Sequence, residues 1–334
     1  MKSAQIEAKG VAPSPRSSHV MCAVGPCLYV FGGESKPRTP IDNIVYKFDA
    51  SSPSASWEAV SSADDPNAPS PRLASCGAAL GDVLYIFGGQ LSEEASVQMG
   101  SGASGEMFSF DPVSKKWARI ADTKGTPPPP TTYATACSLN GVFYMFGGCT
   151  TEGRSNCLFS FSPESAEWCK LPVPEGCRGR GGTSLVPCGA AHLAVVCGFA
   201  GEETNDVWLY DIRAASWKEL EVSGDWPKRS VMSVCSSPDT KKVLTFGGEI
   251  DPSDKGHAGA GQFCDRAWVL DVGTGVASEL SVEGPRPEPR GWTPGCSLTL
   301  SVSGDESSMV MAVFGGNSES NARLGDLFLL DCKL

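Results

Sequence analysis

The stretch LYVFGG, residues 28–33, decides the fold because it recurs along the whole chain. Its copies are LYIFGG at 84–89, FYMFGG at 143–148, VLTFGG at 243–248 and MAVFGG at 311–316, and AVVCGFAG at 194–201 is a degenerate sixth. All but the sixth are short apolar runs that end in a glycine pair, a pattern typical of a buried strand followed by a tight connection. The recurrence predicts a fold built from six similar units.

A second signature follows each copy: two large apolar residues at alternate positions, and then usually an aspartate. The sets are Tyr46/Phe48/Asp49, Phe108/Phe110/Asp111, Phe159/Phe161/Ser162, Trp208/Tyr210/Asp211, Trp268/Leu270/Asp271 and Phe328/Leu330/Asp331. A spacing of two residues indicates a strand with alternate faces buried. A tryptophan comes next in four units, at Trp57, Trp117, Trp168 and Trp217. Each unit therefore predicts a small antiparallel sheet that must stack against its neighbours to bury its faces.

Glycine pair, aromatic pair and tryptophan together resemble the kelch repeat, in which about 50 residues form one propeller blade. The resemblance implies an all-β, six-bladed kelch β-propeller that occupies residues 1–334 as a single domain. The chain ends soon after Asp331, so the sixth blade lacks an outermost strand. We expect residues 3–8 to supply it by pairing beside 326–332, which closes the ring. Helix should be almost absent.

Composition excludes several classes of partner. The net charge of −11 and the pI near 4.8 argue against nucleic acid and anionic membranes, which need a basic surface. The start of the sequence has no apolar signal region, and the longest apolar run, at 190–200, falls short of the ~20 residues that span a bilayer. We therefore predict a cytoplasmic protein whose 14 cysteines are reduced. Four that share one strand position are expected to be buried on the inner strands: Cys22, Cys137, Cys235 and Cys296.

An arginine opens the innermost strand of five units, and in an antiparallel sheet the start of that strand lies beside the glycine pair. The five are Arg16, Arg72, Arg180, Arg229 and Arg290, and the third unit has PPTTY instead. All should converge on one mouth of the central channel. Guanidinium groups pair with carboxylate or sulfate, so these arginines are candidate ligands for a small anion. The alternative is that each arginine pairs with an acid or carbonyl of a neighbouring blade and locks blade to blade.

The loop GGEIDPSDKGHAGAGQFCD, residues 247–265, belongs to the same mouth and contains one of only three histidines. Glu249, Asp254 and His257 are candidate metal ligands, with Asp251 as a possible substitute. A histidine with two carboxylates suits a divalent ion such as Fe(II) or Mn(II) and leaves coordination positions open. The alternative is a solvated acidic loop without a metal.

Several runs resemble the plant kelch proteins around the nitrile-, epithio- and thiocyanate-forming specifier proteins. The runs are CRGRGG at 177–182, GFAGEETNDV at 198–207, GGEIDPSDKGHAGAGQF at 247–263 and GGNSESNARLGDLF at 315–328. The resemblance implies a six-bladed propeller that binds iron(II) (Fe2+) through a glutamate, an aspartate and a histidine of this loop and redirects the breakdown of glucosinolate aglucones.

Carried over by position, Glu249 and His257 match the specifier pattern, and so does Trp292, which joins the predicted ligand-binding set. Ser253 stands at the aspartate position, with Asp254 one place later. Gln90 and Thr131 stand where the specifier proteins have arginines that hold the substrate's sulfate. The metal site is thus expected to be kept and the glucosinolate pocket to be altered.

Three functions stay open on the sequence. The first is a propeller that binds a small anionic ligand or a partner protein at the mouth, with a divalent metal such as Fe2+ on the 249–265 loop. The second is a metal-free protein-interaction scaffold, and the third is an Fe(II)-dependent lyase or isomerase of the specifier kind. The sequence identifies no catalytic residue, and fold alone does not choose between the three.

Overall fold

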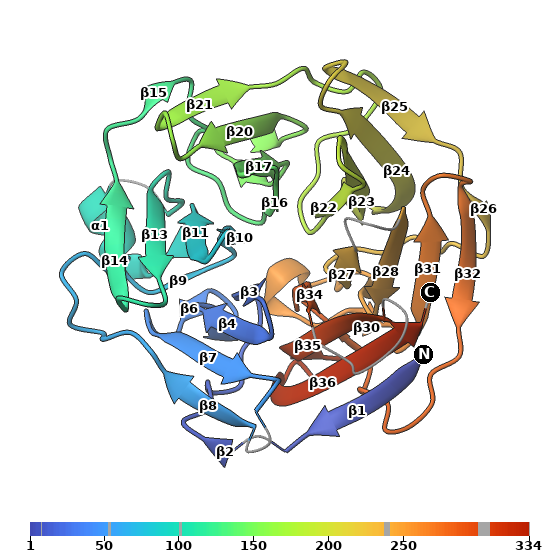
Figure 1. The fold of residues 1–334 in the computed structure, drawn as a ribbon, viewed down its shortest axis with the longest axis horizontal. Coiled ribbons are helices and arrows are strands. Elements are labelled where there is room, and N and C mark those ends of the chain that lie inside the picture. The colour runs from blue at the N-terminus through green and yellow to red at the C-terminus, as the bar shows by residue number, and fades with distance from the viewer. Residues whose placement is uncertain (8, 53–54, 100–101, 237–240, 300–307, 334) are drawn as a thin grey trace.

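The computed structural model describes residues 1–7, 9–52, 55–99, 102–236, 241–299 and 308–333. Six antiparallel sheets stand around a central axis as the blades of a propeller (Figure 1). The prediction of an all-β, six-bladed kelch propeller is confirmed.

Each of blades 1 to 5 has four strands in chain order from the axis outward. Blade 1 contains β3 (Val20–Val24), β4 (Cys27–Phe31), β7 (Val45–Asp49) and β8 (Ser56–Ala59); blade 2 contains β10 (Cys76–Leu80), β11 (Val83–Phe87), β13 (Met107–Asp111) and β14 (Lys116–Ile120). Blade 3 contains β16 (Thr135–Leu139), β17 (Val142–Phe146), β20 (Leu158–Ser162) and β21 (Glu167–Lys170); blade 4 contains β22 (Ser184–Cys188), β23 (His192–Phe199), β24 (Glu203–Asp211) and β25 (Ser216–Leu220). Blade 5 contains β27 (Ser233–Ser236), β28 (Lys242–Phe246), β31 (Ala267–Asp271) and β32 (Val276–Leu280).

Blade 6 is completed by the N-terminal strand, as predicted. Its strands are β34 (Gly295–Leu298), β35 (Ser308–Ser318), β36 (Arg323–Lys333) and β1 (Lys2–Ile6). The register runs from Lys2 opposite Asp331 to Ile6 opposite Leu327. Residue 8, the end of the predicted segment, lies outside the described residues. The ring is closed because the first strand of the chain pairs with the last.

Shorter strands supplement the four main strands of the blades. Two-residue strands run parallel to the outermost strands of blades 1, 3 and 5: β2 (Lys9–Gly10), β15 (Lys124–Gly125) and β26 (Ser223–Gly224). The mouth connections contain β5 (Glu34–Lys36), β6 (Thr39–Pro40), β9 (Arg72–Leu73), β12 (Gln90–Leu91), β18 (Cys149–Thr150), β19 (Gly153–Arg154), β29 (Glu249–Asp251), β30 (Gln262–Phe263) and β33 (Arg290–Gly291).

Helix is limited, in the described residues, to α1 (Glu93–Met99) and the 3-10 turn η1 (Gly256–Ala258). Both lie in connections that follow a glycine pair. No helix in the described ranges has the length and apolar character needed to cross a bilayer.

The repeated tryptophans join neighbouring blades. Each packs on the aromatic residue opposite it in its own blade, as Trp117 does on Phe110 with ring centroids 5.0 Å apart. Each also contacts the phenylalanine that precedes the glycine pair of the previous blade, as Trp117 does with Phe31 at 5.1 Å. Trp57, Trp168 and Trp217 repeat both contacts. The phenylalanine before a glycine pair and the aromatic–tryptophan pair of the next blade therefore pack together in one core between the two blades. In blade 5 the smaller Ala277 pairs with Leu270 and takes the tryptophan's place.

The degenerate repeat copy, AVVCGFAG in blade 4, keeps the backbone conformation of the others despite its different sequence. Cys197 has φ +53 where the other units have their first glycine at φ +65 to +72, and Gly198 takes the place of the second. The second glycine donates its amide to the next blade in every unit, as Gly248 does to the Arg290 carbonyl at 2.9 Å and Gly198 to Arg229. A Cβ on Gly248 would come within 2.7 Å of Ser230 O, which explains why this position stays glycine.

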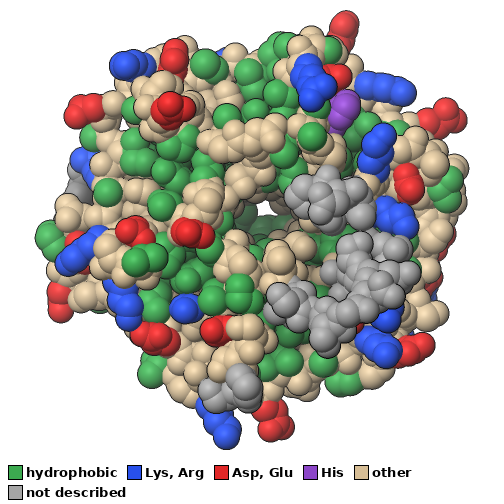
Figure 2. Space-filling view, viewed as in Figure 1, with side chains coloured by type: hydrophobic (Ala, Val, Ile, Leu, Met, Phe, Trp, Pro, Cys, Tyr) green, Lys and Arg blue, Asp and Glu red, His purple; other side chains and the backbone are tan. Residues whose placement is uncertain are grey.

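The inner strands surround a channel of about 480 Å³. In the space-filling view, a hollow with hydrophobic side chains marks its opening at the centre of the face (Figure 2). All 14 cysteines are free. Cys22, Cys137 and Cys235 are buried on inner strands, as predicted, whereas Cys296 is only half-buried. Burial raises the pKa of Cys22 to about 12, so this channel thiol stays protonated.

Candidate functional site at the mouth of the channel

Six residues at the mouth end of the channel form a closed ring of backbone hydrogen bonds. Ser18 donates to Trp292 O (2.8 Å), Ala74 to Ser18 O (2.8 Å), Tyr133 to Ala74 O (2.9 Å), Gly182 to Tyr133 O (3.3 Å), Val231 to Gly182 O (2.7 Å) and Trp292 to Val231 O (2.8 Å). Every member has φ between +46° and +58°. That left-handed conformation is uncommon for residues other than glycine, so the ring fixes these six backbones in an unusual shape. Tyr133 and Trp292 bring aromatic rings to this entrance.

A second circle of residues follows the glycine pairs. Its members are Glu34, Gln90, Cys149, Phe199, Glu249 and Asn317, each paired with the segment that opens an inner strand. Glu34 and Glu249 thus hold equivalent places in blades 1 and 5. Each mouth connection departs from this circle.

The five arginines lie inside the blades and do not reach the surface of the mouth. Their exposed fractions are 0–1%. Each donates to a carbonyl at the end of the second strand of its own blade, as Arg16 does to Gly32 at 2.9 Å and Arg290 to Gly315 at 3.0 Å. The ion pairs are Arg16–Asp42 (2.9 Å), Arg72–Glu106 (3.3 Å), Arg180–Asp206 (2.6 Å) and Arg290–Asp326 (2.6 Å). The alternative of locking blade to blade is wrong in its partners, because each of these four arginines pairs with an acid of its own blade. Anion binding at the mouth stays untested.

Arg229 differs from the other four. No carboxylate pairs with it among the described residues, and Arg266 stands where blades 2, 4 and 6 have the acid. Its guanidinium instead lies 4.1 Å from the ring centroid of Trp268 and donates to Gly247 O at 3.1 Å. Blade 5 therefore buries a cation that is held by an aromatic face, the Gly247 carbonyl and the Thr245 hydroxyl.

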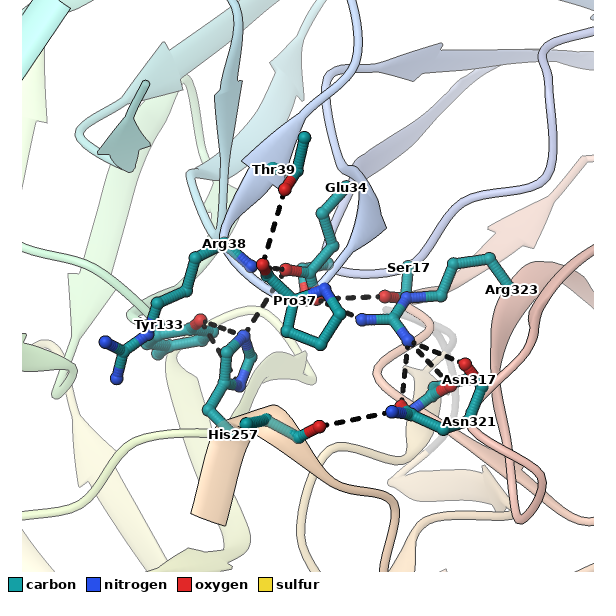
Figure 3. Close-up of polar contacts among 12 residues, drawn as sticks. Ser17, Glu34, Pro37, Arg38, Thr39, Tyr133, His257, Asn317, Asn321 and Arg323 are labelled. Carbon is teal, nitrogen blue, oxygen red and sulfur yellow. Dashed lines mark hydrogen bonds and ion pairs between the residues drawn. The ribbon is translucent and has the colours of Figure 1, made fainter. Parts of the chain in front are cut away.

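His257 extends over the mouth and contacts three other blades (Figure 3). Its Nε2 atom lies 2.8 Å from the Tyr133 hydroxyl and 3.4 Å from Oε2 of Glu34. The imidazole centroid is 4.7 Å from that of Trp292 and 5.2 Å from that of Tyr133, both edge-on. The neighbouring Ala258 carbonyl accepts a hydrogen bond from Asn321 at 3.2 Å.

Glu34 is the centre of this polar network and is 1% exposed. Its Oε1 accepts from the hydroxyls of Ser17 and Ser18, both at 3.1 Å, and pairs with Arg323 at 3.2 Å. Its Oε2 accepts from the Arg38 amide at 2.8 Å. Burial alone would raise the pKa of Glu34, but contacts with His257, Arg323 and the Arg38 amide hold it below its usual value. Glu34 is thus an ionised, fully partnered carboxylate.

Glu249 lies apart from His257, beside a second buried acid. Glu249 and Glu203 are 7% and 6% exposed, and neither carboxyl oxygen of Glu203 has a hydrogen-bond partner among the described atoms. Burial raises the pKa of Glu203 to about 8, and the carboxylates of Glu249 and Asp251 act in the same direction. Burial likewise raises the pKa of Glu249 to about 7. This pair holds protons near neutral pH.

The three candidate metal ligands do not converge. Glu249 is buried beside Glu203, Asp254 is exposed, and His257 faces Glu34 and Tyr133. The described ranges contain no group of three His, Cys, Asp or Glu side chains arranged to hold a metal ion. The residues, as they are placed here, therefore do not fit the three-ligand iron site that the resemblance implies, and the iron prediction itself stays untested.

Sequence reasoning missed Glu34, Tyr133, Arg323 and Glu203. Glu34 could have been found, because it follows its glycine pair as Glu249 does. Tyr133 lies in the PPTTY run that replaces the third arginine. The remaining two, Arg323 and Glu203, carry no signal in the sequence, since only the meeting of separate blades gives them a role. Trp292, a predicted ligand-binding residue, lies beside the 249–265 loop through its contact with His257.

The chain is similar in sequence to several known proteins. The chain is 29% identical to the N-(sulfonatooxy)prop-2-enimidothioate sulfolyase of Thlaspi arvense, over 97% of this chain and 95% of that protein. It is 27% identical to Adagio protein 3 of Arabidopsis thaliana over 72% of this chain, which spans only 40% of that longer protein. Kelch domain-containing protein 3 of Rattus norvegicus is 24% identical, with 74% of this chain and 64% of that protein covered.

Among solved structures, the one titled "Structure of YjhT" superposes with a TM-score of 0.71 at 16% identity and covers 97% of both chains, which supports the fold alone. Residues 18–248 match the KLHDC2/KLHL20/DRC7 Kelch-repeats domain. That match covers more than half of the chain, and the blades, glycine pairs and tryptophans are as the repeat requires; the protein therefore belongs to the kelch-repeat family.

Proposed function

We propose that the protein is a recognition module that binds a segment of a partner protein at the mouth of its channel. The observation that supports this best is the fixed constellation of Glu34, Tyr133 and Trp292. Two aromatic faces beside an ionised carboxylate form a polar and apolar surface of the kind that recognises side chains. Kelch propellers commonly bind proteins, and four of the five mouth arginines are already committed to acids of their own blades.

Selection of binders from a random peptide display library tests this function. Peptides selected on the wild-type protein should lose at least about tenfold in affinity for Tyr133→Ala or Trp292→Ala, because removing an aromatic anchor from an interface costs about 2 kcal/mol or more. His192→Ala changes a half-exposed side chain on β23, away from the mouth, and should bind as the wild type does. If selection yields no peptide, or only peptides that ignore both mouth variants, the proposal is wrong.

A second candidate is a lyase that eliminates sulfate from an N-(sulfonatooxy) imidothioate, as the name of the Thlaspi arvense relative states for that protein. The observation that favours it is a likeness across nearly the whole of both chains. Fe(II) belongs to this candidate as its cofactor, and so does a small anionic ligand, for which Arg38 and Arg154 are two exposed cations of the mouth connections.

Anaerobic incubation with such a substrate, with and without added Fe(II), tests the lyase by the sulfate released above the non-enzymatic rate. Elemental analysis of the anaerobically purified protein beside Glu249→Ala tests the metal separately. Metal-dependent sulfate release that is lost in Glu249→Ala supports the lyase. Release equal to that of buffer in all samples overturns it.

A further inference from the structure

The mouth of the channel is covered by the chain itself. Strands β29 and β30 pair at the base of a hairpin that leaves blade 5, and residues 252–261 form its tip. We propose that this tip is a lid and that His257 latches it by occupying a niche formed by Glu34, Tyr133 and Trp292. The niche would otherwise receive a planar, N–H-bearing side chain of the partner, histidine or arginine. This inference rests on the proposed partner recognition and adds that the protein inhibits it by itself.

The niche is built without the lid. Tyr133 and Trp292 belong to the closed backbone ring, and their side-chain rings contact each other directly, with centroids 5.5 Å apart. Glu34 is fixed by Ser17, Ser18, Arg323 and the Arg38 amide, and none of these partners belongs to the lid. Removing His257 therefore leaves the walls in place.

Few contacts hold the lid down. In the described part of the chain, the lid's hydrogen bonds with other blades are made by two adjacent residues, His257 and Ala258. Asp254, Lys255 and Gly256 are exposed, and the segment contains three glycines. A segment with so few buried contacts opens locally at a small fraction of the cost of global unfolding.

The chemistry of the niche selects its occupant. The imidazole is placed edge-on to two aromatic rings and faces the Glu34 carboxylate and the Tyr133 hydroxyl. Burial raises the pKa of Tyr133 well above its usual value, so the phenol is neutral. A planar group with an N–H donor satisfies both oxygen partners and packs edge-on against the rings. An anion would face an ionised carboxylate whose guanidinium partner, Arg323, is already engaged.

Limited trypsin digestion tests the lid, because Lys255 is the lysine of the tip. Tyr133→Phe removes the hydroxyl that contacts His257 and leaves the cleaved sequence unchanged. We expect cleavage after Lys255 to be about tenfold faster in Tyr133→Phe and in His257→Ala than in the wild type, since one lost hydrogen bond is worth about 1 kcal/mol or slightly more. Tyr144→Phe, in β17 of the same blade as Tyr133, is the matched control and should be cleaved as slowly as the wild type. Equal rates in all four proteins would show that His257 is not a latch.

Imidazole tests the niche directly. Millimolar imidazole should raise the unfolding temperature of His257→Ala in a concentration-dependent way and slow its cleavage by trypsin, because a ligand that binds only the folded state stabilises it. The wild type and His192→Ala, whose niches are filled by His257, should not respond, and acetate should have no effect on any variant. An equal response of all variants, or of none, overturns the assignment of the niche.

The selected peptides separate this inference from the function on which it rests. Self-inhibition predicts that mouth-binding peptides bind His257→Ala about tenfold more tightly than the wild type, because the competitor has been removed. Peptides that need Trp292 but bind both proteins equally would support partner recognition and contradict self-inhibition. Absence of any mouth-dependent peptide would end both.

Discussion

Nε2 of His257 lies 3.4 Å from the Glu34 carboxylate, although 223 residues separate the two in the chain. Glu34 holds in blade 1 the place that Glu249 holds in blade 5, directly after the glycine pair. The loop that begins at one glutamate therefore brings its histidine to the other. At the mouth, His257 therefore meets Glu34 of blade 1, and not Glu249 of its own loop as the sequence suggests.

The closed ring at the mouth makes Gly182 sensitive to substitution. Gly182→Ala should destabilise the protein by about 2–3 kcal/mol, because φ is +57° and the new Cβ would lie 2.7 Å from Cγ1 of Val231. Gly81→Ala is the matched control: its φ is also +57°, but nothing lies within 4 Å of its Cβ, so only the conformational cost of about 1–2 kcal/mol applies. Denaturant unfolding of both variants measures the difference, and equal losses would contradict the steric argument.

Buried arginines make their acids important for stability. Asp326→Asn should cost about 3 kcal/mol, since it leaves the fully buried guanidinium of Arg290 without its bidentate partner. Glu58→Gln, which breaks the exposed ion pair with Lys115, should cost less than about 1 kcal/mol. Urea denaturation compares the two, and a loss in Asp326→Asn no larger than that in Glu58→Gln would show that the buried pair does not stabilise the blade.

Stability should fall with rising pH because of Glu203. Its pKa is raised from 4.5 to about 8 in the folded protein, so the folded state keeps a proton that the unfolded state loses. The contribution of the protonated Glu203 to the free energy of unfolding is therefore fully present below pH 4.5. It declines by about 1.4 kcal/mol per pH unit until about pH 8. Glu203→Gln removes this titration. The free energy of unfolding of this variant should therefore rise relative to that of the wild type as the pH increases from 5 to 8. Parallel stability curves would refute the assignment.

Cysteine reactivity should follow exposure. Thiol titration under denaturing conditions without reductant should find all 14 cysteines, since all are free. In the native protein Cys169 should react first, because it is the exposed one among the fourteen, and Cys169→Ser should abolish this fast phase. Slow reaction of the buried channel thiols Cys22, Cys137 and Cys235 is expected from their protonated state. A denatured count well below fourteen would reveal disulfides and contradict the free state.

The fold was predictable because each blade repeats the same local signals. LYVFGG and its copies, the alternating aromatic pairs and the tryptophans each report a strand, and ring closure followed from a sixth blade that lacked its outer strand. Even the degenerate copy keeps its backbone, with Cys197 at φ +53 in the place of a glycine.

The site was less predictable because its contacts are made between blades. The spacing of Glu249, Asp254 and His257 in one loop predicted that they would meet, but the loop directs His257 across the mouth while Glu249 stays buried beside Glu203. The position of Arg72 or Arg290 at the start of a strand was correct, but sequence alone did not show that an acid of the same blade already holds it.

The ring of Ser18, Ala74, Tyr133, Gly182, Val231 and Trp292 has no ends. A helix leaves unpaired donors at one terminus and unpaired acceptors at the other, and an open sheet leaves them along both edges. Here every amide donates in the same rotational sense, and each of the six residues both donates and accepts within the ring. The mouth is therefore framed by backbone whose six ring amides are all engaged, and selectivity rests with the side chains that project from it.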